Sequence, residues 1–472
     1  MYPSLNEFKR LSQDFERVTV YKEMDGDMDT PVSMLSKFLA FDRAILLESA
    51  KQNKTYSRFS FLAFDITEKM VLKQDGVYRN GEFICPLSQL SKHLVQCRTP
   101  VFSDFGDFSG GYVGYLNFEF VGECGVLKKP LSRKGAFLGV LYLVERFCVY
   151  DNYTNKLYLA VSKPTGDADP EDAYRAVARE LDRTEDRIRG LVVASVQQQS
   201  PPKLVRDIPR GLFIDKVDRT RNMIGEGEAI QIVLSDYLEA EDINPFEFYR
   251  GLRKINPSPY MYFLKDGDDC IVGSSPEIHL HVRNRVATLK PIAGTKKREP
   301  SKEIQEIIDC LTNDEKERAE HLMLVDLARN DLSRICKVGT VRVESFMQPE
   351  VYSHVVHLVS EVKGRLAEDL HVFDALKQTF PAGTVSGAPK VRAIEVIDEM
   401  EDGPRGAYAG CLGYIGFNGS LDMAITIRTG IFRGNRARLQ AGAGIVYDSV
   451  PEREYDEVLN KLLVLMKSGG LA

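Results

Sequence analysis

Short segments rich in β-branched and aromatic residues recur along the whole chain and constrain its fold more than any other feature. Examples are AILLES at 44–49, RFSFLAF at 58–64, FLGVLYLVERFCVYD at 137–151, YMYFLKD at 260–266 and LDMAITIRTGIF at 421–432. Turn residues bound these segments, and many follow one another across short turns, which favours antiparallel strands. Helical patterns lie between them, at roughly 213–226, 301–330, 370–379, 388–401 and 451–467. We therefore predict an α+β fold of mostly antiparallel sheet with helices outside.

Composition excludes several classes of protein. With 472 residues, of which 43% are hydrophobic, the chain can bury a large core and is not disordered. A net charge of −6 argues against nucleic acid or an anionic membrane surface as the main partner. No apolar run approaches the length of a membrane span, and the N-terminus lacks the apolar centre of a secretion signal. Eight scattered cysteines without a C-x-x-C pair indicate reduced thiols and a cytoplasmic protein.

One stretch resembles a linker between two regions. VVASVQQQSPPKLVRDIP at 192–209 contains three glutamines and a pair of prolines, and it follows the charged helical pattern at 169–191. We predict a boundary here, with an N-terminal region at 1–195 and a C-terminal region at 205–470.

Two of the predicted helices each carry a Glu-x-x-Glu pair at the edge of an apolar stripe. Thr312 and Glu315 have the spacing of a capping box, which predicts a helix that starts near 313 and carries Glu317 and Glu320. Ser449 and Glu452 have the same spacing, at the start of the helix at 451–467 that carries Glu454 and Glu457. Each pair can be explained as an acidic first turn that favours the helix dipole. If the two pairs face each other, they would repel unless a cation lay between them, and hard oxygen ligands suit Mg²⁺.

Other polar residues stand in apolar surroundings. His357 lies in the predicted strand VVHLVSEVKG, as a functional group or as a satisfied core histidine. Arg428 lies in the apolar strand AITIRTG, where its charge needs a partner, either a ligand carboxylate or a structural acid. The pair His279 and His281, and His354, are weaker candidates.

Two glycine-rich stretches, at 380–390 and 440–449, fail the spacing of the nucleotide-binding loops. They are either anion-binding turns with free backbone N–H groups or tight connections between strand and helix.

Six motifs occur together in one order. They are PIAGT (291–295), AEHLMLVDLARNDL (319–332), VVHLVSEVKG (355–364), FPAGTVSGAPK (380–390), YAGCLGYIGF (408–417) and AGAGIVYDSVPEREYDE (441–457). Their order and spacing resemble those of the chorismate-binding enzymes, and among these the anthranilate synthase large subunits. The resemblance covers about residues 15–468 and implies two largely antiparallel sheets packed as a sandwich.

The resemblance also implies roles for individual residues. Glu320 and Glu457 match Mg²⁺ ligands, with Glu317 and Glu454 as supporting acids. His357 matches a catalytic histidine, and Glu277 matches the acid near the departing C4 hydroxyl of chorismate. The matched substrate contacts are Thr295, Thr384, Tyr408, Arg428, Gly442 and Gly444.

The implied reaction is the Mg²⁺-dependent addition of ammonia to C2 of chorismate, followed by loss of pyruvate to give anthranilate. The sequence carries no recognisable glutaminase nucleophile motif, so a separate glutamine amidotransferase subunit is the expected source of ammonia, in a hetero-oligomer. Tryptophan is the expected feedback inhibitor. Its matched pocket consists of Pro31, Glu48, Ser49, Pro257, Ser258, Pro259, Tyr260 and Met261, for which packing at strand ends is the alternative explanation.

Related reactions remain as alternatives: amination at C4 (aminodeoxychorismate synthase), addition of water (isochorismate synthase), and arrest at the aminated intermediate (aminodeoxyisochorismate synthase). A non-catalytic amino-acid sensor is a further one, although His357 and the four glutamates are all in place. Water-adding relatives carry a lysine where this chain has Gln231, and C4-aminating relatives carry one where it has Ala293. Amination at C2 is therefore favoured. The chain departs from the family pattern in TKKRE at 295–299 and at Glu228.

Overall fold

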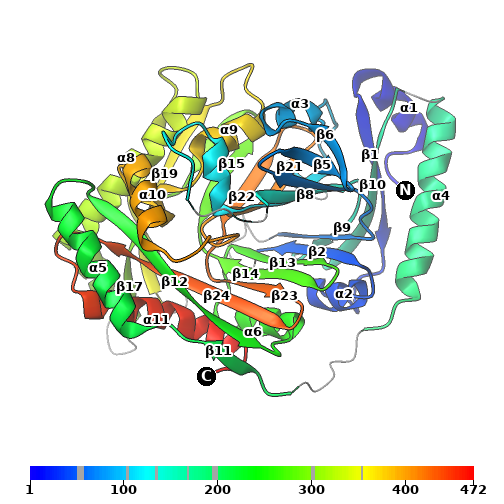
Figure 1. The fold of residues 1–472 in the computed structure, drawn as a ribbon. Coiled ribbons are helices and arrows are strands. Elements are labelled where there is room, and N and C mark those ends of the chain that lie inside the picture. The colour runs from blue at the N-terminus through cyan, green and yellow to red at the C-terminus, as the bar shows by residue number, and fades with distance from the viewer. Residues whose placement is uncertain are drawn as a thin grey trace.

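The structure is a computed structural model of the chain. It describes residues 1–49, 58–102, 106–132, 135, 137–166, 169–193, 200–298, 303–351 and 355–472. Two twelve-stranded sheets form its centre, and helices cover their outer faces (Figure 1). Every strand pairing within the two sheets is antiparallel. The predicted α+β fold with two largely antiparallel sheets is confirmed.

The first sheet runs from the N-terminal region into the C-terminal region. Its strands, in spatial order, are β1 (Arg17–Met24), β10 (Lys156–Pro164), β9 (Arg146–Asp151), β3 (Phe59–Phe64), β2 (Arg43–Glu48), β13 (Tyr260–Asp266), β14 (Asp269–Ser275), β23 (Thr429–Arg433), β24 (Arg436–Ile445), β12 (Gln231–Glu241) and β11 (Lys203–Arg206), with β20 (Gly387–Ala388) beside β12.

The second sheet also contains strands from both the N-terminal and the C-terminal region. Its order is β17 (Ile292–Lys297), β19 (Val355–Arg365), β16 (Val286–Leu289), β15 (Ile278–Arg283), β22 (Leu421–Ile425), β21 (Cys411–Gly416), β7 (Gly111–Leu116), β8 (Gly139–Val144), β4 (Lys69–Lys73), β5 (Gly76–Arg79) and β6 (Glu82–Cys85), with β18 (Arg342–Val351) beside β19. Because β2 pairs with β13 and β7 pairs with β21, both regions of the chain build both sheets. The boundary near residue 200 stays a prediction, and residues 194–199 lie outside the described ranges.

An apolar core joins the two sheets. The first sheet contributes Ile45, Phe147 and Tyr262 to one buried cluster, and the second contributes Tyr142 and Leu412, among others. Between them the ring of Phe108 lies 5.1 Å from that of Phe147 and 4.9 Å from that of Tyr414. The apolar residues that alternate along the strands thus point between the two sheets, and the inward side chains of both sheets form one core, as in a β-sandwich.

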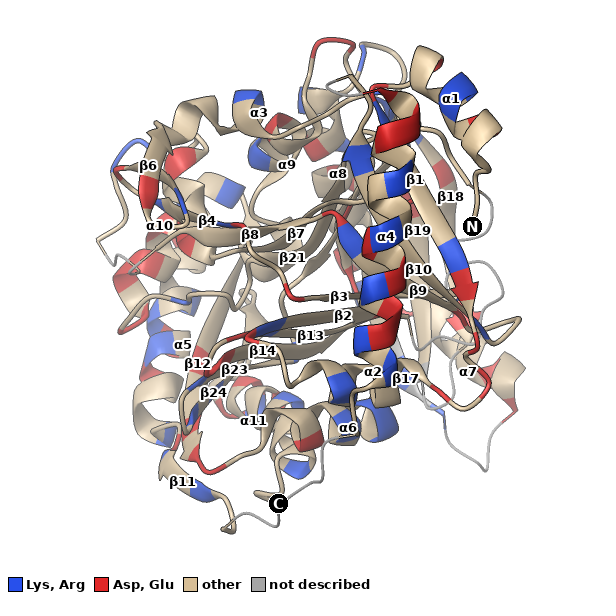
Figure 2. Cartoon of the chain, turned by 90° about the vertical axis from the view of Figure 1, so that its right-hand side faces the viewer, with Lys and Arg blue, Asp and Glu red and all other residues tan. Residues whose placement is uncertain are grey.

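The helices are α1 (Leu5–Asp14), α2 (Pro31–Phe38), α3 (Leu90–His93), α4 (Pro170–Arg189), α5 (Arg210–Gly225), α6 (Pro245–Ile255), α7 (Ile304–Thr312), α8 (Glu315–Ile335), α9 (Val372–Thr379), α10 (Lys390–Met400) and α11 (Pro451–Ser468). Helix α4 lies outside β1 and β10, and Figure 2 shows charged residues along its outer face. Helices α8 and α11 pack against the two sheets, α8 on β17 and β19, α11 on β24.

The helix at 301–330 proves to be two helices. Asp314 separates them, because its carboxylate accepts a hydrogen bond from the backbone N–H of Glu317 and so caps α8. The capping box assigned to Thr312 and Glu315 was therefore wrong by two residues. The one assigned to Ser449 and Glu452 was wrong as well, since α11 begins after Val450 without a side-chain cap.

Within the described ranges, no helix combines the length and apolar character needed to cross a membrane. All eight cysteines are free thiols.

Candidate active site

A cavity of about 500 Å³ collects residues from six separate motifs. Helices α8 and α11, strands β12, β19 and β24, and the loops that precede β13, β15 and β23 supply its wall. The residues predicted for the site that line this cavity are Glu277, Glu320, His357, Thr384, Tyr408, Arg428, Gly442, Gly444 and Glu457. The fold therefore places nine of the twelve predicted catalytic, metal and substrate residues around one space.

Gly442 and Gly444 form a flat wall of this cavity because they lie inside strand β24. Gly442 pairs with Ser235 and Gly444 with Val233 of β12. A Cβ atom at Gly442 would lie 2.6 Å from the Leu234 carbonyl oxygen, and one at Gly444 would lie 2.6 Å from the Gln231 Nε2 atom. The backbone oxygen of Leu234 therefore excludes a side chain at Gly442, whereas at Gly444 the flexible end of Gln231 would have to move. The stretch 440–445 is thus part of a strand and not an anion-binding turn.

Glu277 lies between β14 and β15, with its backbone N–H donating to the Ser275 hydroxyl at 3.3 Å. Burial raises the pKa of its carboxyl to about 7, against the opposing influence of the Thr384 hydroxyl and the Arg428 guanidinium. At neutral pH a large fraction of this carboxyl is protonated, so it can act as a general acid.

Arg428 is a half-buried cation in a strained position. Its φ of 51° lies in the left-handed region, which an arginine rarely adopts. Burial lowers the pKa of its guanidinium, and Glu277 is the acid that opposes this shift. In the part of the chain that the structure describes, no carboxylate forms an ion pair with it. Glu277 therefore offsets only part of the cost of desolvating this guanidinium, and an anionic ligand would relieve the rest.

The two Glu-x-x-Glu pairs lie near each other across the cavity. Burial raises the pKa values of Glu317, Glu320 and Glu454, and the Glu457 carboxylate raises all three further. One cation balances part of this charge: the Lys461 ammonium lies 2.8 Å from the Glu457 carboxylate and donates to the Gly442 carbonyl. The cluster remains acidic, which favours binding of a cation.

This donor set was tested against a divalent metal. As the side chains stand, no group of three or more acids, histidines or cysteines among the described residues is close enough to hold one. The chemistry of the set nevertheless fits, because four carboxylates offer hard oxygen donors, and the raised pKa values of Glu317, Glu320 and Glu454 reflect a repulsion that a bound cation would relieve. Glu320 and Glu457 line the cavity, whereas Glu317 and Glu454 stand one helical turn N-terminal to them.

His357 lies on β19, directly opposite Thr295 of β17. Its Nδ1 atom is 3.3 Å from the Gly294 carbonyl oxygen. If Nδ1 donates to that carbonyl, Nε2 is the unprotonated nitrogen and can accept a proton. The side chains of Thr295 and Ala293, and all of His354, lie outside the described residues.

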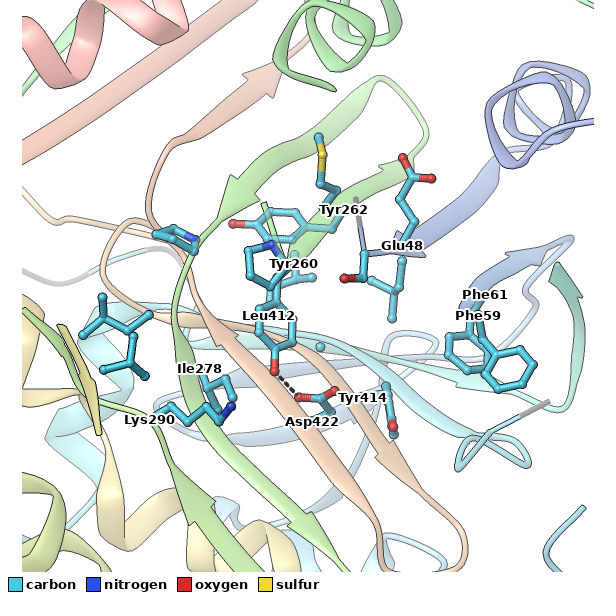
Figure 3. Close-up of a pocket in the computed structure, with 18 of the residues that line it drawn as sticks. Glu48, Phe59, Phe61, Tyr260, Tyr262, Ile278, Lys290, Leu412, Tyr414 and Asp422 are labelled. Carbon is cyan, nitrogen blue, oxygen red and sulfur yellow. Dashed lines mark hydrogen bonds between the residues drawn. The ribbon is translucent and has the colours of Figure 1, made fainter. Parts of the chain in front are cut away.

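A second cavity, of about 180 Å³, adjoins the first (Figure 3). Glu48, Ser49, Tyr260 and Met261 line it, while Pro259 lines both cavities. The remaining residues of the predicted tryptophan pocket lie elsewhere. Pro257 and Ser258 line the larger cavity, and Pro31 is the first residue of α2.

Within this second cavity, polar side chains differ in their contacts. The Tyr260 hydroxyl donates to Asp422 at 2.9 Å. The Glu48 carboxylate accepts hydrogen bonds from Tyr249 and Arg253 of α6. The Ser49 hydroxyl is buried and has no partner among the described residues, so a ligand is free to bind it.

A family model described as chorismate binding enzyme matches residues 42–467. The chain belongs to the chorismate-binding enzyme family. Two relatives named anthranilate synthase component 1 are each 39% identical to it: that of Acetivibrio thermocellus, over 99% of this chain and 98% of the relative, and that of Aquifex aeolicus (strain VF5), over 98% and 97%.

Solved structures agree with this membership. The crystal structure of anthranilate synthase component I from Streptococcus pneumoniae TIGR4 matches with a TM-score of 0.76 and 36% identity, over 88% of this chain and 94% of that one. The menaquinone-specific isochorismate synthase of Escherichia coli matches with a TM-score of 0.69 over 99% and 98%, and its 20% identity shows the shared fold alone. The resemblance found in the six motifs is confirmed.

Sequence reasoning missed several residues of this chorismate-binding enzyme's cavity. Lys461 stands four residues after Glu457 on α11, a spacing that predicts an ion pair and was a usable signal. Gln440 is buried, and its amide donates to the Ser235 hydroxyl. Glu401 accepts from the same hydroxyl and pairs with Arg405. No local pattern marks this network, because its members come from three separate elements.

Proposed function

We propose that this chorismate-binding enzyme is the large subunit of an anthranilate synthase. It adds ammonia to C2 of chorismate and then eliminates pyruvate to give anthranilate, the first step of tryptophan biosynthesis. The observation that carries the proposal is the content of one cavity, which holds a carboxyl with a pKa of about 7, a half-buried guanidinium without an ion pair among the described residues, and an acidic cluster. Chorismate carries two carboxylates and a leaving hydroxyl, which such a set can bind and protonate.

Binding follows from charge. Arg428 binds the enolpyruvyl carboxylate, with the buried Tyr408 beside it. Glu320 and Glu457 bind Mg²⁺, with Glu317 and Glu454 supporting them. When bound, the metal holds the ring carboxylate and draws negative charge onto it. Thr295, Thr384, Gly442 and Gly444 complete the substrate contacts, and the Thr384 hydroxyl also acts on the Glu277 carboxyl, whose pKa it lowers.

The chain's own groups then transfer protons. Glu277 donates its proton to the C4 oxygen as ammonia bonds to C2, and water leaves. In the second step the proton on C2 is removed, the C3–O bond breaks, and the ring becomes aromatic as pyruvate departs. His357 serves this acid–base chemistry through the ring nitrogen that does not face the Gly294 carbonyl.

Amination at C2 is the favoured branch. Gln231 is buried in the wall of the cavity, and an amide cannot take a proton from water at neutral pH. Ammonia is already a nucleophile and needs no such base. Ala293 likewise supplies no amine that could attack the ring. Aminodeoxychorismate synthase and aminodeoxyisochorismate synthase activities are the alternatives that product analysis separates.

A partner is part of the proposal. The relatives carry the name component 1, which supports a second component for this chain too. We assign to it the glutamine amidotransferase that supplies ammonia, in a cytoplasmic hetero-oligomer. The two regions at 1–195 and 205–470 belong to one sandwich, the first carrying part of the regulatory pocket and the second the catalytic residues.

Tryptophan is the proposed inhibitor, bound in the second cavity. The unpartnered Ser49 hydroxyl and the aromatic wall around Tyr260 suit an indole ring with a polar main chain. Pro259, Pro276 and Ile292 line both cavities, so a ligand that moves this shared wall changes the site for chorismate.

The test is a product assay on the purified chain with chorismate, Mg²⁺ and ammonium salt, with products identified by mass and fluorescence. Anthranilate and pyruvate are the expected products. Isochorismate, or an aminated compound without pyruvate, would assign the chain to another branch of the family.

A further inference from the structure

A small cavity of about 40 Å³ adjoins the main cavity at Glu277. Glu277, Leu324 and Thr384 line both spaces. The other polar residues that line the small cavity are His279, Lys290, Asp331 and Thr379. The carboxyl assigned as general acid thus lines both the substrate cavity and a second, smaller space.

His279 is the unexplained group in this small cavity. Its side chain is only 2% exposed, and neither ring nitrogen has a hydrogen-bond partner among the described residues. The pairing of β15 with β22 shifts register between Ile278 and Leu280, so His279 sits at an irregularity of the strand. An aromatic neighbour, Phe380, lies edge-on at 5.5 Å between ring centroids. Burying an imidazole without hydrogen-bond partners is unfavourable, so these two nitrogens call for a partner.

Ordered water would satisfy these atoms. A water molecule needs roughly 10–15 Å³ of such space and two to four polar partners. A cavity of about 40 Å³ accommodates two or three waters. Its wall offers two nitrogens of His279, the Thr384 hydroxyl and the Glu277 carboxyl. These are enough partners to hold a short chain of water molecules between His279 and Glu277.

The charged groups around the cavity are already paired. The Lys390 ammonium lies 2.7 Å and 2.9 Å from the two Asp331 oxygens and donates to the Thr379 carbonyl. Lys290 lies 3.8 Å from Glu361, and Arg428 reaches Glu277 electrostatically from the substrate side. Burial, with a smaller effect of Lys390, lowers the pKa of His279 to about 3. His279 therefore stays neutral at working pH and offers one donor and one acceptor.

We propose that water in this cavity, held by His279 and Thr384, returns a proton to Glu277 after each amination. The inference rests on the proposed function, in which Glu277 protonates the leaving oxygen. In that step the C2–N bond forms, the C4–O bond breaks, and Glu277 becomes a carboxylate as water departs. The added nitrogen carries an extra proton, which it releases, so the proton count balances. Because substrate fills the main cavity at that moment, the small cavity supplies the path for reprotonation.

Two substitutions separate this role from packing. His279→Leu removes both nitrogens at a similar volume, and His279→Gln keeps a donor and an acceptor. We expect kcat for His279→Leu to fall about tenfold, part of the 10²–10⁴ that a general acid contributes. The solvent deuterium isotope effect on kcat should rise, and the pH limb assigned to Glu277 should move. His279→Gln should retain kcat within about threefold.

The controls fix the interpretation. All rates are measured at saturating chorismate and at constant free ammonia, because pH changes the fraction of ammonia that is unprotonated. A folded His279→Leu variant with the parent kcat and isotope effect would overturn the proposal. If that variant does not fold, a crystal structure of the unaltered chain decides, since a dry cavity beside His279 would also overturn it. Failure of the proposed function would instead appear as a different product from the unaltered chain.

Discussion

Replacement of Arg428 by methionine should weaken chorismate turnover strongly while leaving the free chain at least as stable. The guanidinium lines the cavity and is half-buried, and no carboxylate of the described residues forms an ion pair with it. In the complex it meets a substrate carboxylate, whereas in the free chain Glu277 offsets only part of the cost of its desolvation. Methionine keeps most of the volume and removes the charge.

The magnitude follows from these contacts. A hydrogen bond to a charged group contributes about 1.5–3 kcal/mol, and removal of one partner of a buried ion pair costs about 3–5 kcal/mol. We take about 2–4 kcal/mol of lost transition-state binding, which corresponds to a fall in kcat/KM of about 30-fold to 1,000-fold. Loss of an unpaired buried charge is neutral or favourable for folding, so the thermal midpoint of the free chain should not drop.

A second consequence concerns pH. Arg428 lowers the pKa of Glu277, which burial raises to about 7. Without Arg428 that pKa rises further. A general acid is active while protonated, so the decline of kcat on the alkaline side should move to higher pH.

The assay is anthranilate fluorescence with ammonium salt at constant free ammonia, together with thermal unfolding. Arg433→Met is the matched control, because Arg433 ends β23, is exposed and lines no part of the active cavity. It should leave kcat/KM within about twofold, since its exposed charge makes little difference to binding. A kcat/KM for Arg428→Met within threefold of the parent value would refute the role assigned to this guanidinium.

Four further outcomes are expected. Glu320→Gln and Glu457→Gln should each abolish turnover without unfolding the chain. The control Glu315→Gln, on the exposed first turn of α8, should keep the parent turnover. Full activity in excess chelator would contradict the metal assignment. Ser49→Phe should fill the second cavity and remove inhibition by tryptophan in initial-rate assays. If tryptophan inhibits this variant at the same concentration as the unaltered chain, the pocket assignment is wrong. The purified chain alone should use ammonia and not glutamine, which glutamine-dependent turnover would disprove. Measured at constant free ammonia, kcat/KM of the unaltered chain should fall as pH rises through about 7, and a flat profile would remove Glu277 as the acid.

Much of the cavity could be predicted because each contributing motif carries its own local signal. An acid pair beside an apolar helical stripe, as at Glu320, or a cation inside an apolar strand, as at Arg428, is visible without knowledge of the fold. The strand pattern likewise predicted mostly antiparallel sheet, since antiparallel pairing across short turns needs only local information, whereas the division into two sheets came from the family resemblance. Only the family resemblance predicted which motifs lie together in the fold, because spacing along the sequence does not determine which strands become neighbours.

Features that depend on contacts between distant elements could not be predicted. Asp314 caps α8 only because α7 ends just before it, a break that the continuous helical pattern hides. The sequence pattern around Gly444 predicts a loop, but the residue lies in strand β24 because it pairs with Val233 of β12. The sequence made His279 only a weak candidate for a functional residue. Its importance depends on a cavity whose wall includes Thr384 and Glu277, which lie in other parts of the fold.

The most direct test of the account is the stoichiometry of the products formed by the purified chain. With chorismate, Mg²⁺ and ammonium salt, anthranilate and pyruvate should appear in equal amounts and at equal rates, because loss of pyruvate completes the same catalytic cycle that adds nitrogen at C2. Pyruvate is measured by a coupled assay and the aromatic product by mass. An aminated product that accumulates without pyruvate, or isochorismate in place of anthranilate, would contradict the account.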